Sequence, residues 1–203
     1  MKQYESELIL DTRAEVGEGP IWVNDTLYWV DITEGGVHAY NPQTGKNRST
    51  YIGEAVGTVV PCASGGLAVA AIQGFCSLEF DTGKLSVLNN PEAGNLKTRF
   101  NDGKCDPAGR FWAGSCPLDE ESPIGTLYRL DSDHTVHPQL KGLKIPNGIV
   151  WSHDNSTMYY IDTPTQRVDA FDYHHDSGNI TNQRIAFEIP EEMGLPDGMT
   201  IDA

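Results

Sequence analysis

The sequence of 203 residues lacks several features that would each assign it to a broad class of protein. No run approaches the ~20 apolar residues of a membrane-spanning helix, and the first residues contain no apolar stretch of signal-peptide length. Basic residues are scarce, with 14 Lys and Arg against 29 Asp and Glu, so the net charge of -15 repels nucleic-acid phosphates and anionic membranes. We therefore expect a cytoplasmic protein that binds neither nucleic acid nor a membrane.

Cysteine is sparse, and its four positions lack metal-binding or redox spacing. No Cys-x-x-Cys pair occurs among Cys62, Cys76, Cys105 and Cys116, which argues against a zinc knuckle or a thioredoxin-like site. We expect reduced and mostly buried thiols. The chain is long enough for one sizeable core and shows no change in composition, so residues 1–203 are predicted to form a single domain.

Helical periodicity is absent over any convincing length, and the chain consists of short apolar runs separated by turn residues. Between residues 19 and 46 these runs are rich in Val, Ile, Tyr and Trp and are interrupted by Asn-Asp, Gly-Gly and Pro-to-Gly turns. This pattern predicts a meandering antiparallel sheet. A further strand is predicted at residues 7–11, and residues 191–194 can form one helical turn.

The same pattern of runs recurs along the chain. Opening glycines fall at positions 19, 57, 103, 148 and 198, at intervals of 38, 46, 45 and 50 residues. Repeats of about 40 to 50 residues with four short strands each predict an all-β propeller, with an accidentally regular sandwich as the alternative. The fifth unit stops soon after its glycine, so we expect four blades and the start of a fifth. An unclosed edge would favour self-association.

Oxygen-bearing side chains precede most of these glycines. In four of the five units, the position just before the glycine or next to it holds such a residue: Glu18, Asp102 or its neighbour Asn101, Asn147 and Asp197. Residues just before the inner strands of a propeller are predicted to lie at one mouth of its central channel. Each alone is an ordinary turn residue, but together these oxygen donors indicate a site for a hard divalent cation.

Five separated motifs carry a resemblance to a known family. EVGEGPIW, RFNDGKCDPAGRFWAGS, PNGIVWS, YYIDT with VDAFDY, and PDGMTIDA occur in this order from about residue 12 to the end. Together they resemble the regucalcin (senescence marker protein) and gluconolactonase family. The resemblance implies a six-bladed propeller, of which this chain would be an incomplete part that lacks its C-terminal portion.

The resemblance also implies roles for individual residues. Glu18, Asn147 and Asp197 match the family's three protein metal ligands, and Asp197 also matches its proton acceptor and donor. Arg99 and Asn101 match residues that contact the substrate. The repeat phase alone does not separate Asn101 from its neighbour, and here the resemblance favours Asn101.

An acidic substrate-contacting residue of the family aligns with Asp119, although Glu120 or Glu121 could serve because this loop varies. Lys104 and Arg110 flank a turn and are expected to be solvated charges.

The implied activity is metal-dependent hydrolysis of a small-molecule sugar lactone to the aldonic acid. Ca²⁺ is the expected ion, with Zn²⁺, Mn²⁺ or Mg²⁺ as alternatives. The rival functions are a calcium-binding regulatory protein without essential catalysis, an interaction scaffold, and an ester or organophosphate hydrolase. His174 and His175 lie in a turn between strands and are expected to be exposed and outside the site.

Overall fold

The computed structural model describes residue 5 and residues 7–202, and its strands form four antiparallel sheets. Every sheet contains four strands that are consecutive in the sequence and also neighbours in space. This order follows from short runs joined by tight turns, because a tight turn can only join antiparallel neighbours.

The four sheets are numbered as blades in chain order. Blade 1 contains β1 (Gly17–Val23), β2 (Thr26–Asp31), β3 (Gly36–Asn41) and β4 (Lys46–Tyr51). Blade 2 contains β5 (Val56–Pro61), β6 (Leu67–Ala71), β7 (Gly74–Glu79) and β8 (Lys84–Asn89). Blade 3 contains β9 (Thr98–Cys105), β10 (Phe111–Pro117), β11 (Gly125–Leu130) and β12 (Val136–Leu143). Blade 4 contains β13 (Pro146–Trp151), β14 (Thr157–Asp162), β15 (Arg167–His174) and β16 (Asn179–Glu188).

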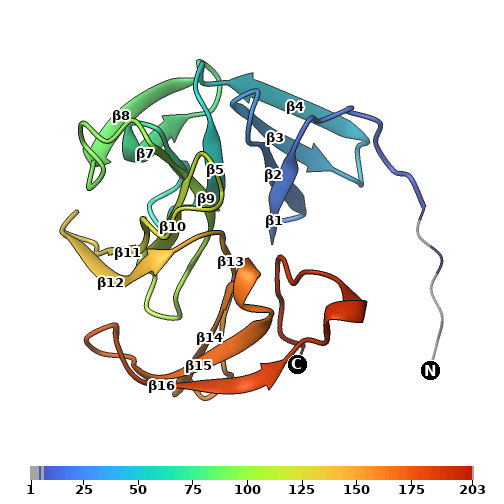
Figure 1. The fold of residues 1–203 in the computed structure, drawn as a ribbon. Coiled ribbons are helices and arrows are strands. Elements are labelled where there is room, and N and C mark those ends of the chain that lie inside the picture. Colours follow the sequence, from blue (N-terminus) through green and yellow to red (C-terminus); the bar gives the residue numbers. More distant parts are fainter. Residues whose placement is uncertain (1–4, 6, 203) are drawn as a thin grey trace.

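The blades are arranged radially, with β1, β5, β9 and β13 innermost (Figure 1). One predicted repeat therefore corresponds to one blade, and the predicted all-β propeller is confirmed. Two 3-10 turns, η1 (Thr163–Thr165) and η2 (Glu191–Met193), are the helical elements of the described chain, and neither is long enough to cross a membrane. The second of them is the predicted helical turn.

The hydrophobic core lies between neighbouring blades. One cluster joins blades 1 and 2 through residues such as Val30 and Val59, and a second joins blades 2 and 3 around Phe75. A third cluster joins blades 3 and 4, where the rings of Trp112 and Trp151 meet edge to face at 5.8 Å between centroids. In blades 2 and 3, which have a neighbouring blade on either side, the alternating side chains of a strand thus serve two interfaces.

The strand predicted at residues 7–11 is wrong, because this segment forms no strand. Residues 198–202 follow blade 4 as the predicted start of a fifth unit, but they are not paired as a strand. An extended segment becomes a strand only when its backbone pairs with a neighbour, and neither segment pairs with a strand of the described chain. Apolar sequence alone therefore overestimated the extent of the sheets.

Candidate functional site

Every inner strand carries a β-bulge, an extra residue that its paired strand does not match. A bulge bends the strand and redirects its side chains. The position before the glycine, which repeats in the sequence, therefore corresponds to an irregularity of the backbone that repeats from blade to blade. Glu18, Asn101, Asp102 and Asn147 consequently lie inside the inner strands rather than just before them, whereas Asp197 lies in no strand. The shifts in register fall at Glu18 to Ile21, Val56 to Thr58, Phe100 to Gly103, and Asn147 to Ile149.

Blade 2 brings backbone rather than an oxygen ligand to the centre. Its bulge contains the apolar Val56 followed by Gly57, and a Cβ atom at Gly57 would lie 2.3 Å from the carbonyl oxygen of Asn101. Such a distance is far below a van der Waals contact, so only glycine fits between β5 and β9. The hydroxyl of Thr58 also donates to the carbonyl of Gly103 at 3.0 Å.

A chain of hydrogen bonds fixes which atom Asn147 presents to the centre. Thr163 Oγ1 donates to the carbonyl of Pro196 at 2.8 Å, because a carbonyl can only accept. The same hydroxyl oxygen therefore accepts from Asn147 Nδ2 at 2.7 Å. Because Nδ2 of Asn147 faces Thr163, the Oδ1 atom of Asn147 points the other way, where Asn101 Nδ2 lies 3.3 Å from it. The oxygen that a cation would bind is thus the one turned away from Thr163.

Asn101 is held just as firmly and links the centre to Arg99. Its Nδ2 donates to the carbonyl of Pro146 at 2.8 Å, and its Oδ1 accepts from Arg99 Nη1 at 2.7 Å. Arg99 Nη2 in turn contacts Glu120 Oε1 at 3.2 Å, so Asn147, Asn101, Arg99 and Glu120 form a continuous row of polar groups. The amide groups of Asn101 and Asn147 are buried, whereas Glu120 is half exposed, so the row runs from the interior to the surface.

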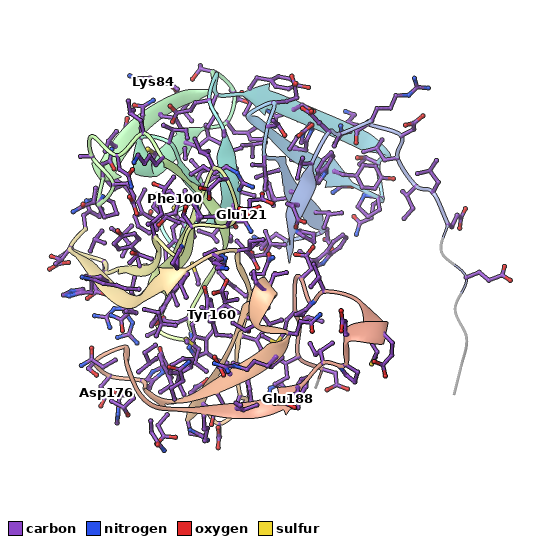
Figure 2. The ribbon with its side chains drawn as sticks, viewed as in Figure 1. Lys84, Phe100, Glu121, Tyr160, Asp176 and Glu188 are labelled. Atoms are coloured by element: carbon purple, nitrogen blue, oxygen red, sulfur yellow. The ribbon has the colours of Figure 1, made fainter. Side chains whose placement is uncertain are left out.

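The three acidic residues of the following loop have different partners. Asp119 accepts hydrogen bonds from the hydroxyl and backbone of Ser122 and from the backbone of Glu121, which lowers the pKa of Asp119 to about 2. Its carboxylate therefore shapes its own loop, while Glu120 contacts Arg99. Glu121 is drawn over the middle of the ring in Figure 2, and its backbone N–H is the one that donates to Asp119.

Three carboxylates share the centre of the ring. Burial raises the pKa of Glu18, the charge of Asp197 raises it further, and the N–H of Gly19 opposes both. Burial also raises the pKa of Asp102 to about 6, with contributions from Glu18 and Asp197, against the opposing N–H of Gly103 and charge of Lys104. Like charges in a partly desolvated space raise each other's pKa, and a bound cation would relieve this.

The segment after blade 4 brings Asp197 beside the inner strands. The N–H of Gly148 donates to the carbonyl of Asp197 at 3.2 Å, next to the amide of Asn147. A Cβ at Gly148 would lie 2.7 Å from the Cβ of Met199 and 2.9 Å from the Asp197 carbonyl. Gly148 therefore provides the space into which this exposed segment packs.

A cavity of about 310 Å³ continues along the channel from this point, lined by Glu18, Asp102, Lys104 and Met199 among others. A larger hollow of about 600 Å³ lies on the face of blade 1, where Trp22 and Trp29 are among its lining residues. That hollow is mainly apolar and shares only Glu18 with the candidate site. The smaller cavity has both Glu18 and Asp102 in its lining, so the chemistry points to it rather than to the larger hollow.

The donor set fits a hard cation. Within residue 5 and residues 7–202, no three His, Cys, Asp or Glu groups form a metal centre by themselves. The candidate set differs because Asn147 adds an oriented amide oxygen to the carboxylates of Glu18 and Asp197. Calcium typically takes about six to eight oxygen ligands, so solvent or substrate oxygens would complete the shell.

One functional candidate was missed in the sequence, and two charges were assigned wrongly. Thr163, which orients Asn147, gives no local signal beyond its place in the YYIDT motif. Lys104 and Arg110 are not simply solvated, because Lys104 donates to the Met199 carbonyl at 3.2 Å and Arg110 forms a buried ion pair with Asp106 at 2.7 Å.

The fold and this centre define a propeller with an acidic, oxygen-lined central site. The family model described as the SMP-30/Gluconolactonase/LRE-like region matches residues 16–203. The chain belongs to this family, as its motifs indicated.

Known relatives are longer than this chain. It is 35% identical over 210 residues to regucalcin of Xenopus laevis, spanning all of this chain and 70% of that protein. It is 37% identical over 194 residues to a Bacillus subtilis protein named "Putative sugar lactone lactonase YvrE", spanning 95% of this chain and 66% of the relative. A solved luciferin-regenerating enzyme is 35% identical, with a TM-score of 0.87 over 92% of this chain and 66% of that one.

Gly148→Ala tests whether the close contact at β13 places the Asp197 segment. The backbone conformation of Gly148 suits any residue, so the new methyl group acts through its contacts with Met199 and Asp197 and with the flexible end of the Ile161 side chain, which lies 2.9 Å away. We expect Ca²⁺ affinity, measured by isothermal titration calorimetry, to fall by about 10- to 100-fold, as for other changes to groups that support a metal ligand.

Gly198→Ala is the matched control, since a Cβ there meets no atom within 4 Å. It should bind Ca²⁺ like the unaltered protein. Equal Ca²⁺ affinity of Gly148→Ala and Gly198→Ala would contradict the claim that the contact at Gly148 places Asp197 for cation binding.

Proposed function

We propose that this protein hydrolyses sugar lactones at one divalent cation held by Glu18, Asn147 and Asp197. The observation that carries the proposal is the fixed row of polar groups from Glu120 through Arg99 and Asn101 to Asn147. A protein that only binds a cation has no need of an arginine beside the ligands. Membership of the family supports the same activity, since its description includes gluconolactonase.

Calcium is the ion we favour, because every proposed ligand is an oxygen and none is sulfur or imidazole. Zn²⁺, Mn²⁺ and Mg²⁺ are the alternatives. When bound, the ion would polarise the lactone carbonyl and stabilise negative charge on its oxygen.

Asp197 supplies the proton transfers in this proposal. Its side chain is exposed at the mouth of the channel, where it can accept a proton from the attacking water and return it to the ring oxygen of the lactone. The charge of Asp197 already influences Glu18 and Asp102, which places all three in one electrostatic field. Substitution of Asp197 thus removes a ligand and a base together.

Arg99 and Glu120 would bind the sugar. Within the described chain the guanidinium of Arg99 uses three of its N–H groups, on the Phe100 carbonyl, Asn101 and Glu120, so two are left for hydroxyl groups. Its planar fork gives directional donors, which suits a sugar and its anionic product. Glu120 rather than Asp119 is our choice for the acidic contact, because the carboxylate of Asp119 is bound by its own loop.

A reducing compartment such as the cytoplasm suits the protein, because all four cysteines are free thiols. Burial raises the pKa of Cys76 and Cys116 to about 11 and that of Cys105 to about 12. These thiols are therefore protonated and weakly nucleophilic at neutral pH.

The activity itself is tested with a pH-indicator assay of glucono-δ-lactone hydrolysis after chelator treatment. We expect acid release only when Ca²⁺, Mn²⁺, Mg²⁺ or Zn²⁺ is restored. Asp197→Asn should lower the rate by about 10²- to 10⁴-fold, the usual contribution of a general base. His174→Ala alters an exposed histidine away from the site and should leave the rate unchanged.

The lactonase proposal fails if folded protein with a measured bound cation gives no rate above background on several aldonolactones. Cation binding without hydrolysis would favour the calcium-binding regulatory function instead.

Glu120→Gln tests the acidic substrate contact. We expect KM for the lactone to rise about fivefold with little change in kcat, because a half-exposed ion pair contributes at most about 1 kcal/mol. Glu121→Gln removes the same charge from the adjacent residue and is the matched control. If the two variants give the same KM, the assignment of Glu120 is wrong.

A further inference from the structure

The segment of residues 195–202 carries Asp197 but contains no strand, so its backbone depends on isolated contacts. Figure 1 shows this segment curling back toward the centre of the ring beside β13. Contacts from the blades reach four of its backbone carbonyl groups. They are Thr163 Oγ1 to Pro196 at 2.8 Å, Gly148 N to Asp197 at 3.2 Å, Lys104 Nζ to Met199 at 3.2 Å, and His153 Nε2 to Asp202 at 2.5 Å.

Lys104 lies on a different blade from the other three residues that contact this segment. Thr163, Gly148 and His153 belong to blade 4 or directly follow its strands, and blade 4 is also the blade from which the segment leaves. Lys104 belongs to β9 of blade 3, 95 residues before Met199. Contacts with a single blade allow a segment to swing as one body, whereas a contact with a second blade fixes its position across the channel.

The placement of Lys104 follows from β9. Residues two apart on a strand share a face, so Lys104 and Asp102 both line the 310 Å³ cavity. Lys104 is half-buried, and its ammonium group reaches the Met199 carbonyl with a hydrogen bond strengthened by its charge.

We infer that Lys104 is a positioning residue for Asp197. By holding the Met199 carbonyl from blade 3, it keeps the carboxylate two residues earlier beside Glu18 and Asn147. The inference rests on the proposed function in taking Asp197 as a ligand, but the contact with the segment is testable without any cation.

The sign of the effect on cation binding separates positioning from simple charge. A lysine that acted only as a nearby positive charge would repel the ion, so its removal would tighten binding. A lysine that holds the Asp197 segment would, when removed, weaken binding. Lys104→Met removes both the donor and the charge at similar length, and Lys104→Arg retains both.

Calorimetric titration of the apo protein with Ca²⁺ is the first test. We expect Lys104→Met to weaken binding about 10- to 100-fold and Lys104→Arg to recover most of the affinity. Lys84→Met is the matched control, because Lys84 carries the same charge on an exposed edge of blade 2, as seen in Figure 2. Affinity of Lys104→Met equal to or tighter than that of Lys84→Met would overturn the inference.

Hydrogen exchange of the cation-free protein is the second test, with mass-spectrometric detection. Amides in residues 195–202 should exchange faster in Lys104→Met than in Lys84→Met, while exchange in the sheets and the thermal midpoint stay similar. Unchanged exchange in this segment would overturn the inference. If the unaltered protein binds no cation, the proposed function fails, yet the exchange result still decides whether Lys104 holds the segment.

Discussion

Close packing of the inner strands around the central channel is the constraint on which the rest of this structure depends. At Gly57 and Gly148 an added Cβ would collide with neighbouring backbone or Cβ atoms at less than 3 Å. These glycines fall at the bulges, where the strand must bend to avoid its neighbour. The residue beside the glycine is then directed to the centre, and this links the packing of the blades to the chemistry of the site.

The same crowding explains the electrostatics of the centre. Glu18 and Asp102 are brought together where water is partly excluded, and burial raises the pKa of both carboxyl groups. Hydrogen bonds from Gly19 and Gly103, together with the charge of Lys104, offset only part of this cost. A divalent cation is the natural complement of such a centre, because it binds the carboxylates and removes their mutual repulsion.

The blades, and the position of the candidate ligands just before the repeated glycines, could be predicted from sequence because both depend on local patterns. Turn residues mark the strands, and the repeated position before glycine marks the bulges. The role of Lys104 and the choice of Glu120 over Asp119 could not be predicted, because they depend on partners 95 and 21 residues away. Residues 7–11 illustrate the same limit, since an apolar run forms a strand only where a neighbour offers its backbone.

The central claim is that Glu18, Asn147 and Asp197 bind one divalent cation. The most direct measurement is an anomalous-difference map from crystals of the protein soaked in Mn²⁺, which locates the ion without reference to activity. The account predicts one strong peak within bonding distance of oxygen atoms from all three side chains. A well-ordered centre with no peak, or with the ion bound by other residues, would contradict it.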